Sequence, residues 1–329
     1  MSVQDTDQGG SGPAGSPLIE AVTALSGRES VAVAARYGIW LEAATRRWWE
    51  FWTTPRNAAS PPQAVNFHAS GRGDALLLLN GWTASGLVWP DRWLRDLEAR
   101  FHVIRVDNRG SGWSRLAPAP YDIADLANDA AAVLRTLHVE KATVLGLSMG
   151  GAIAQELAIR HPQLVSALVL AGTRPPTPDH IPGDPAELAA ALRPKPDSES
   201  LPDFYRAMWA GQMAPGFAAA HPEVLDEVVG KVLSRVTPRK MAMTQARAMS
   251  AWSGPGRLRS ISAPTTVVHG RLDRMMPVGN GIRLAQAIPG ARYTELRDVG
   301  HLIPFEAPGV LLAAVTEAAT LGVQSEGRS

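Results

Sequence analysis

The sequence predicts a doubly wound, mostly parallel α/β sheet, and three observations support this fold class. Short apolar runs typical of buried strands alternate along the chain with segments of helical periodicity. The pentapeptide 146–150 stands between such a strand and such a helix. The alternation is broken once, by an insertion at residues 174–250 between two predicted core strands. Insertions at the carboxyl edge of a parallel sheet lie over the ligand crevice, so this one is interpreted as a cap or lid.

The individual elements follow from the spacing of apolar residues. A short first strand is predicted within residues 63–68, and the apolar segment 75–79 is typical of a fully buried strand. The remaining strands are predicted, in chain order, at residues 101–106, 142–145, 166–171, 265–268 and 292–296. The helices that alternate with them are predicted at residues 89–100, 123–137, 151–159, 279–288 and 307–320.

Four regions make up the predicted domain organisation. Residues 1–16 are rich in Gly, Ser, Asp and Gln and are expected to form a disordered tail. Residues 17–55 form a helical extension, and the sheet core comprises residues 63–173 and 251–320. The insertion at residues 174–250 carries eight prolines up to position 202 and is then helical and rich in Met, Ala and Arg.

The extension contains a Trp-rich helix, predicted at residues 37–52. Its apolar side chains recur at the i, i+3, i+4, i+7 spacing of one helix face, and four of the ten tryptophans of the chain fall in it. Three interpretations remain open for this face: packing on the protein's own core, docking of a partner or of a second copy as a homodimer, and binding at a membrane surface. The polar face is not strongly basic, which disfavours the membrane.

The composition excludes several classes of function. The chain has 329 residues and a net charge of +1, without basic or acidic blocks, so nothing favours nucleic acid as a partner. It contains no cysteine, which excludes disulfides, thiolate metal sites and a cysteine nucleophile. No stretch is long and apolar enough for a transmembrane segment, and the polar N-terminal residues do not resemble a secretory signal. A cytoplasmic location is therefore expected.

Ser148 is the candidate nucleophile. It lies at the predicted strand-to-helix corner, where Gly146 and Gly150 leave room for a strained turn that exposes the hydroxyl. The N-terminus of the following helix carries partial positive charge and favours an oxyanion at the same place. The five-residue pattern alone can arise by chance in a chain with 30 glycines, so a base, an acid and a second oxyanion donor are needed to support it.

His301 is the candidate base and Asp273 the candidate acid. Each follows one of the last two predicted strands, in a loop that can reach the sheet edge. The chain order Ser, Asp, His is the order of one class of serine hydrolases. A serine hydroxyl needs a neutral imidazole to take its proton, and a carboxylate fixes the imidazole tautomer. The rival acid Asp298 has the position of a turn residue. The competing histidines are interpreted as structural: His102, His161 and His269. For His269, at a strand end, a supporting role beside the triad stays open as well.

The backbone amides of Trp82 and Met149 are the predicted oxyanion-hole donors. Gly81 lets the loop after the first core strand approach closely, so the amide of Trp82 can face the reacting carbonyl. Met149 follows the nucleophile directly. Four side chains are open to two interpretations, an apolar acyl pocket or ordinary core packing: Met149, Met208, Trp209 and Met213. Asp107 and Arg109 are interpreted as loop-bracing residues.

Together these segments resemble the α/β-hydrolase superfamily, in the branch that holds esterases, lactonases, carbon–carbon bond hydrolases, cofactor-free haloperoxidases and epoxide hydrolases. The resemblance covers about residues 63–320 and rests on five segments in the family's order: 80–82, 107–114, 146–150, 270–273 and 300–301. Many relatives carry a histidine where this chain has Asn80, so Asn80 and Gly81 are interpreted as site-shaping. Relatives that cleave epoxides or haloalkanes use an aspartate nucleophile, so Ser148 favours acyl chemistry.

The resemblance implies a serine hydrolase that cleaves a carboxylic ester of a small molecule through an acyl-enzyme on Ser148, without a cofactor or metal. Three other reactions remain open, because pocket and cap decide the substrate: lactone hydrolysis, carbon–carbon bond hydrolysis and acyl transfer on a specialised metabolite. A non-catalytic binding protein on the same scaffold is the least favoured alternative, since all three members of the triad are present.

Overall fold

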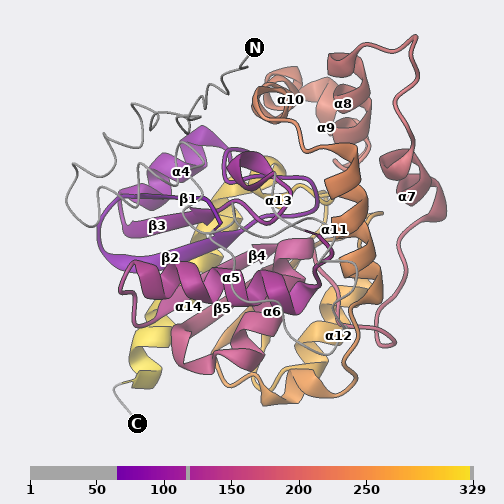
Figure 1. Cartoon of the computed structure of the whole chain (residues 1–329). Helices are drawn as coiled ribbons and strands as arrows, with labels where there is room; N and C mark the ends of the chain where they lie inside the picture. Colours follow the sequence, from indigo (N-terminus) through magenta and orange to yellow (C-terminus); the bar gives the residue numbers. More distant parts are fainter. Residues whose placement is uncertain (1–64, 116–118, 327–329) are drawn as a thin grey trace, which may run out of the picture.

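The computed structural model describes residues 65–115 and 119–326, and one sheet organises them (Figure 1). Seven strands follow in the order β1-β3-β2-β4-β5-β6-β7. β1 runs antiparallel to β3, and all other neighbouring strands are parallel. The strands are β1 (Phe67–Ser70), β2 (Asp74–Leu79), β3 (Phe101–Val106), β4 (Ala142–Leu147), β5 (Val165–Ala171), β6 (Thr265–Gly270) and β7 (Arg292–Leu296). The predicted mostly parallel α/β sheet is confirmed.

Helices cover both faces of the sheet, because successive strand side chains point into two different apolar layers. One layer contains Leu77 and Val144, the other contains Leu76 and Leu145, and all four side chains are fully buried. The helices of the first layer are α5 (Ile123–Thr136), α6 (Met149–Arg160) and α12 (Gly279–Ala287). The helices of the second layer are α4 (Asp91–Glu98) and α14 (Pro308–Glu326).

Five helices lie between β5 and β6, in the segment predicted as an insertion. They are α7 (Pro185–Leu192), α8 (Leu201–Ala210), α9 (Phe217–Ala220), α10 (Pro222–Ser234) and α11 (Arg239–Ala251). Figure 1 shows α8, α9 and α10 at the upper right of the view, α7 at the right, and α11 running down the right side beside the sheet and its covering helices. A small apolar core of their own includes Trp209 and Val228, and it also contains Leu302 and Phe305 from the region after β7. The insertion therefore rests on the loops at one edge of the sheet.

Two helices begin inside the proline-rich stretch of the insertion, earlier than the helical part expected from residue 203. Pro185 opens α7 directly after Asp184, whose carboxylate accepts the N–H of Ala186 at 2.8 Å. Ser200 caps α8 in the same way, and Pro202 stands in its first turn. Proline is tolerated there because the first helical N–H groups have no partner within the helix. These prolines lie at the starts of helices, and a count of prolines alone does not show this.

Several expectations fall on residues that are not described. The predicted tail at 1–16, the extension at 17–55 and the Trp-rich helix at 37–52 lie outside the described residues, and so do the first two residues of the predicted strand at 63–68. In the described part, β1 begins later than expected, at Phe67. Among the described helices, none combines the length and the apolar character that a membrane crossing needs.

We predict that Gly150→Ala destabilises the fold. A methyl group on Gly150 would overlap the backbone carbonyl of Leu79 in β2, so α6 and β2 would have to separate. Crowding of this kind costs about 1–3 kcal/mol, more where backbone must move. Gly230→Ala is the matched control, because nothing lies within 4 Å of its added methyl group in α10. We expect the control to gain up to about 1 kcal/mol in urea unfolding, from helix propensity and unfolded-state entropy. Equal unfolding midpoints for both variants would contradict this packing argument.

Candidate active site

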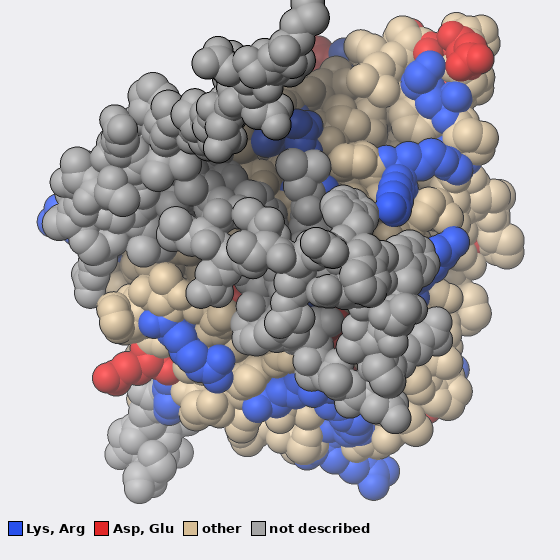
Figure 2. Space-filling view, in the orientation of Figure 1, with Lys and Arg blue, Asp and Glu red and all other residues tan. Residues whose placement is uncertain are grey.

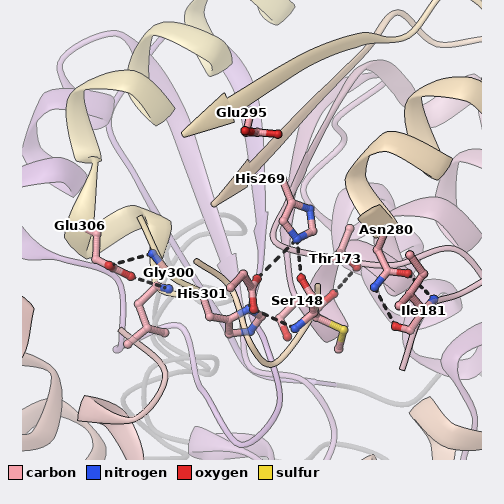
Figure 3. Close-up of polar contacts among 12 residues, drawn as sticks. Ser148, Thr173, Ile181, His269, Asn280, Glu295, Gly300, His301 and Glu306 are labelled. Carbon is pink, nitrogen blue, oxygen red and sulfur yellow. Dashed lines mark hydrogen bonds and ion pairs between the residues drawn. The ribbon is translucent and has the colours of Figure 1, made fainter. Parts of the chain in front are cut away.

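Ser148 occupies a strained corner between β4 and α6. Its backbone has φ 56° and ψ −119°, a left-handed conformation that non-glycine residues rarely adopt. Hydrogen bonds hold the corner in place: the N–H of Ser148 donates to Ala171 O at 3.0 Å, and the hydroxyl of Thr173 donates to Ser148 O at 2.7 Å (Figure 3). Any side chain on Gly146 would overlap the backbone of Gly150. Both flanking glycines are therefore required, as the sequence predicted.

Asp273 and His301 come together at the ends of β6 and β7. His301 Nδ1 lies 2.7 Å from Asp273 Oδ2, and both side chains are buried. The other oxygen of Asp273 accepts the N–H of Met276 at 2.7 Å, so the carboxylate is fixed in the loop after β6. A carboxylate beside Nδ1 favours the tautomer that carries its proton there, which leaves the lone pair of Nε2 available as a base.

The electrostatics of this pair favour an ionised Asp273 and a readily protonated His301. Burial alone would raise the pKa of Asp273, but the charge of His301 and hydrogen bonds from His269 and His301 hold this pKa below its ordinary value. Burial alone would lower the pKa of His301, but the charge and hydrogen bond of Asp273, with the charge of Glu306, raise this pKa above its ordinary value. The pair is therefore suited to accept a proton at Nε2.

His269 supports the acid. Its Nε2 lies 2.6 Å from Met276 O and 3.5 Å from Asp273 Oδ2, inside a site where its side chain is fully buried (Figure 3). Both neighbouring atoms are acceptors, so Nε2 carries the proton. The sequence placed His269 at a strand end and left its role between packing and support. The structure brings it against Asp273, while His161 lies elsewhere, beside Asn128 and Arg135.

Ser148 and His301 line one small cavity of about 40 Å³. Asn80, Gly81 and Trp82 form another part of its wall. Among the described residues, no hydrogen bond joins the hydroxyl of Ser148 to the imidazole, and such contacts often tighten only when substrate binds. Of the four side chains considered for an acyl pocket, Trp209 lines this cavity, while Met149 belongs to the core of the sheet and Met213 to the core of the insertion.

The backbone beside Ser148 offers two N–H groups. A methyl group placed on Gly81 would lie 3.2 Å from Ser148 Cβ, so the loop after β2 passes against the serine. In the described part of the chain, the N–H groups of Trp82 and Met149 donate to no protein acceptor. Asn80 is tied away from the serine, since its amide donates to Val106 O at 3.2 Å. These contacts agree with a site-shaping role for Asn80.

Glu306 fixes the loop that carries His301, and sequence reasoning missed it. Its carboxylate accepts the N–H groups on either side of His301, from Gly300 at 2.9 Å and from Leu302 at 3.0 Å (Figure 3). It also accepts the N–H of Ala214 in the insertion at 2.8 Å. Burial raises the pKa of Glu306, and these hydrogen bonds and the charge of His301 offset the rise only in part. The one sequence feature that could have indicated this role is the position of the Glu306 carboxylate, one helical turn after Leu302.

The insertion is bonded to both loops of the site. The backbone N–H of His301 donates to Gln212 O at 2.9 Å, which joins the loop of His301 to the turn after α8. On the other side, the indole of Trp82 donates to Ala242 O at 2.7 Å, and the side chain of Gln245 accepts the N–H of Thr83 at 2.9 Å. Both of these partners lie in α11. The inserted helices therefore complete the walls around Ser148.

Asp107 and Arg109 brace the neighbouring loop, as the sequence indicated. Asp107 accepts the N–H groups of Gly86 and Trp113, and Arg109 forms a buried ion pair with Asp129 at 2.5 Å. Within residues 65–115 and 119–326, no three His, Asp or Glu side chains form a cluster that could hold a metal ion.

A parallel sheet with a serine at one strand-to-helix corner and a histidine and a carboxylate after later strands has the architecture of the α/β hydrolases. The family model described as alpha/beta hydrolase fold matches residues 74–308. The chain therefore belongs to the α/β-hydrolase family.

Individual relatives cover most of the chain. It is 30% identical over 297 residues to Rhodomycin D methylesterase DauP of Streptomyces sp. strain C5, which covers 78% of this chain and 97% of that protein. It is 30% identical over 242 residues to pimeloyl-(acyl-carrier protein) methyl ester esterase of Vibrio parahaemolyticus, with 72% and 91% covered. The crystal structure of the enol-lactonase from Burkholderia xenovorans LB400 is similar with a TM-score of 0.66 and 25% identity, over 78% of this chain and 96% of that chain.

Proposed function

We propose that the protein hydrolyses carboxylic esters through an acyl-enzyme on Ser148. One observation carries the proposal. Ser148 is held at φ 56° on the wall of a cavity shared with His301, whose Nδ1 lies 2.7 Å from the buried carboxylate of Asp273. A strained serine, an imidazole and a carboxylate in this arrangement are the elements of an activated nucleophile.

The reaction takes two steps of acyl transfer. Ser148 Oγ attacks the acyl carbon while His301 Nε2 takes the hydroxyl proton, and Asp273 stays ionised and stabilises the imidazolium. The backbone N–H of Trp82, in the loop after β2, and that of Met149, at the start of α6, hold the oxyanion. The tetrahedral intermediate then breaks its bond to the alcohol oxygen, and His301 returns the proton to the departing alcohol. Water attacks the acyl-enzyme by the same sequence, which releases the acid and restores the serine.

The size of the cavity indicates which part of the ester lies beside Ser148. The free space beside Ser148 is small, about 40 Å³. A small group such as a methoxy leaving group suits that space. The methyl ester substrates in the names of the two relatives support the same choice for this chain. The insertion then acts as a cap that receives the larger part of the substrate.

Lactone hydrolysis is the second candidate, because the enol-lactonase is similar in fold over most of the chain. The same three side chains would open a lactone, with the leaving alcohol still attached to the acyl group. A substrate series of methyl esters, longer alkyl esters and lactones decides between the two. Faster turnover of lactones than of methyl esters with the same acyl chain would favour the second candidate.

Ser148→Ala tests the nucleophile. We expect kcat for methyl esters to fall by at least about 10⁴-fold, because no hydroxyl remains to form the acyl-enzyme. The native protein should gain one covalent adduct from a fluorophosphonate, located on Ser148 by mass spectrometry. Ser260→Ala is the control, since this exposed hydroxyl bonds only Arg257 O in the described structure. Full turnover in Ser148→Ala would contradict the proposed mechanism. Labelling at another serine would assign the nucleophile to that serine instead.

The rate should fall on the acid side of neutrality. His301 acts as a base only when neutral, and its pKa is raised above the ordinary value of 6.5. We therefore expect the acid limb of the kcat/KM profile to have its midpoint above pH 6.5. The contribution of His301 to folding stability changes with pH in the opposite direction to the rate. It is fully present below the pKa that His301 has in the unfolded chain, and it is lost as pH rises through the pKa of His301 in the folded protein. A profile measured at constant ionic strength from pH 5 to 9 that stays flat would exclude His301 as the base.

Glu306→Gln tests the positioning of the base. A neutral amide has one acceptor oxygen for three N–H groups, so the loop around His301 should loosen and kcat should fall about 10- to 100-fold with little change in KM. The acid limb should also move to lower pH, because the charge of Glu306 raises the pKa of His301. Glu295→Gln is the control, an exposed carboxylate on β7. A lower kcat without movement of the limb would indicate a structural role alone.

A further inference from the structure

A second and larger cavity, of about 250 Å³, lies within the insertion. Side chains of α8 form an apolar part of its wall, among them Phe204, Tyr205 and Met208. Met243 of α11 belongs to the same wall. Aromatic rings and flexible thioethers make a surface on which a ring or a chain can pack without a unique shape.

The larger cavity borders the cavity at Ser148, and Trp82 lies between them. This residue lines both the small cavity at Ser148 and the larger one. Its indole N–H donates to Ala242 O, and Ala242 also lines the larger cavity, so the indole is fixed as a shared wall. The backbone N–H of the same residue is the proposed oxyanion donor. A substrate whose carbonyl meets that N–H therefore has its larger part within reach of the second cavity.

The charge of the larger cavity is one-sided. Arg193, Lys195 and Arg239 line it, and no Asp or Glu does. Figure 2 shows several Lys and Arg side chains along the right side of the view, where α7, α8 and α11 lie in Figure 1, and one group of Asp or Glu side chains at the upper right corner. Arg193 is balanced by a two-pronged ion pair with Glu199, at 2.7 and 2.8 Å. The other two cations are left with an excess positive charge.

In the described part of the chain, no ion pair within 4.0 Å joins Lys195 or Arg239 to a carboxylate, and of these two cations only Lys195 acts through its charge on Glu199. Lys195 donates to Pro196 O at 2.7 Å and to Glu199 O at 2.8 Å, which leaves one of its three N–H bonds available. Arg239 makes only long bonds, of 3.2 to 3.5 Å, to Leu192 O and Arg193 O. Both groups retain donors for an acceptor that carries negative charge.

We propose that this cavity binds an anionic group, a carboxylate or a phosphate-like group, on the larger part of the ester substrate. The chain or ring that carries the anion packs against Phe204 and Tyr205, and Lys195 and Arg239 receive its charge. The small end of the ester lies beside Ser148. This inference rests on the proposed esterase function and adds the substrate class to it.

The experiment compares pairs of methyl esters that differ in one terminal charge. Monomethyl esters of dicarboxylic acids with 6 to 12 carbons are set beside methyl esters of monocarboxylic acids of equal length. Methyl esters with a terminal phosphonate form a third series, which separates the two kinds of anion. We expect one length of charged ester to exceed its neutral partner at least about 10-fold in kcat/KM, and the advantage to shrink as salt is added.

Variants assign the advantage to the cavity. In Lys195→Gln and in Arg239→Gln we expect the ratio of kcat/KM for the charged ester to kcat/KM for the neutral ester to fall at least about 5-fold. Arg247→Gln is the matched control, because it removes an exposed arginine of α11 that does not line the cavity. A native enzyme without preference, or a preference that survives in both variants, would overturn the inference.

Failure of the proposed function is seen separately. If the native protein cleaves no ester in any series, the esterase proposal is wrong, and calorimetry with the free dicarboxylate then decides on the cavity. The dianion should bind Ser148→Ala and lose at least about 5-fold in affinity when Arg239→Gln is added. Equal affinity for both proteins, or no binding to either, would overturn the anion site.

Discussion

The rest of the site depends on how closely α6 approaches β2. Gly146 and Gly150 permit this approach, and it forces Ser148 into a left-handed conformation that costs about 1–3 kcal/mol. Hydrogen bonds from Ser148 to Ala171 and from Thr173 to Ser148 oppose that strain, so three strands of the sheet take part in one corner. With an unstrained backbone conformation, the side chain of Ser148 would point back toward the sheet. The strain therefore holds the hydroxyl at the cavity, and a rigid core sustains it.

The two loops that complete the site are held by the insertion as well as by the sheet. Gln212 and Ala214 bond the loop of His301, while Ala242 and Gln245 bond the loop of Trp82. Any displacement of the inserted helices thus acts on His301 and on the loop of Trp82 together. An insertion that also walls the larger cavity can translate the fit of a substrate into the alignment of the reacting groups, which is how binding energy contributes to specificity.

The sequence was most informative where the backbone imposes a unique residue type. Gly146 and Gly150 mark close contacts that leave no room for a side chain, and Gly81 marks a tight contact with Ser148. The apolar strands beside them are buried in the core, as their residue types predict. Contacts between distant segments left no such mark. Glu306 carries no pattern that points to the N–H of Ala214, and His269 could be assigned only once Asp273 was seen beside it. The helices starting at Pro185 and Leu201 were obscured because proline breaks helices in all but their first turn.

Charge balance distinguishes the larger cavity from the loops around the site. Arg109 is paired with Asp129, and Arg257 is paired with Glu156. These cations hold loops in place, and their partner carboxylates neutralise their charge. The larger cavity is lined by three cations and by no carboxylate, and of the three only Arg193 forms an ion pair in the described part of the chain, with Glu199. An unbalanced positive field between apolar walls concentrates anions, and it acts over about the 8–10 Å of a Debye length at moderate salt. Attraction of an anionic substrate would therefore begin before its ester reaches Ser148, and the orientation of entry would follow from the charge.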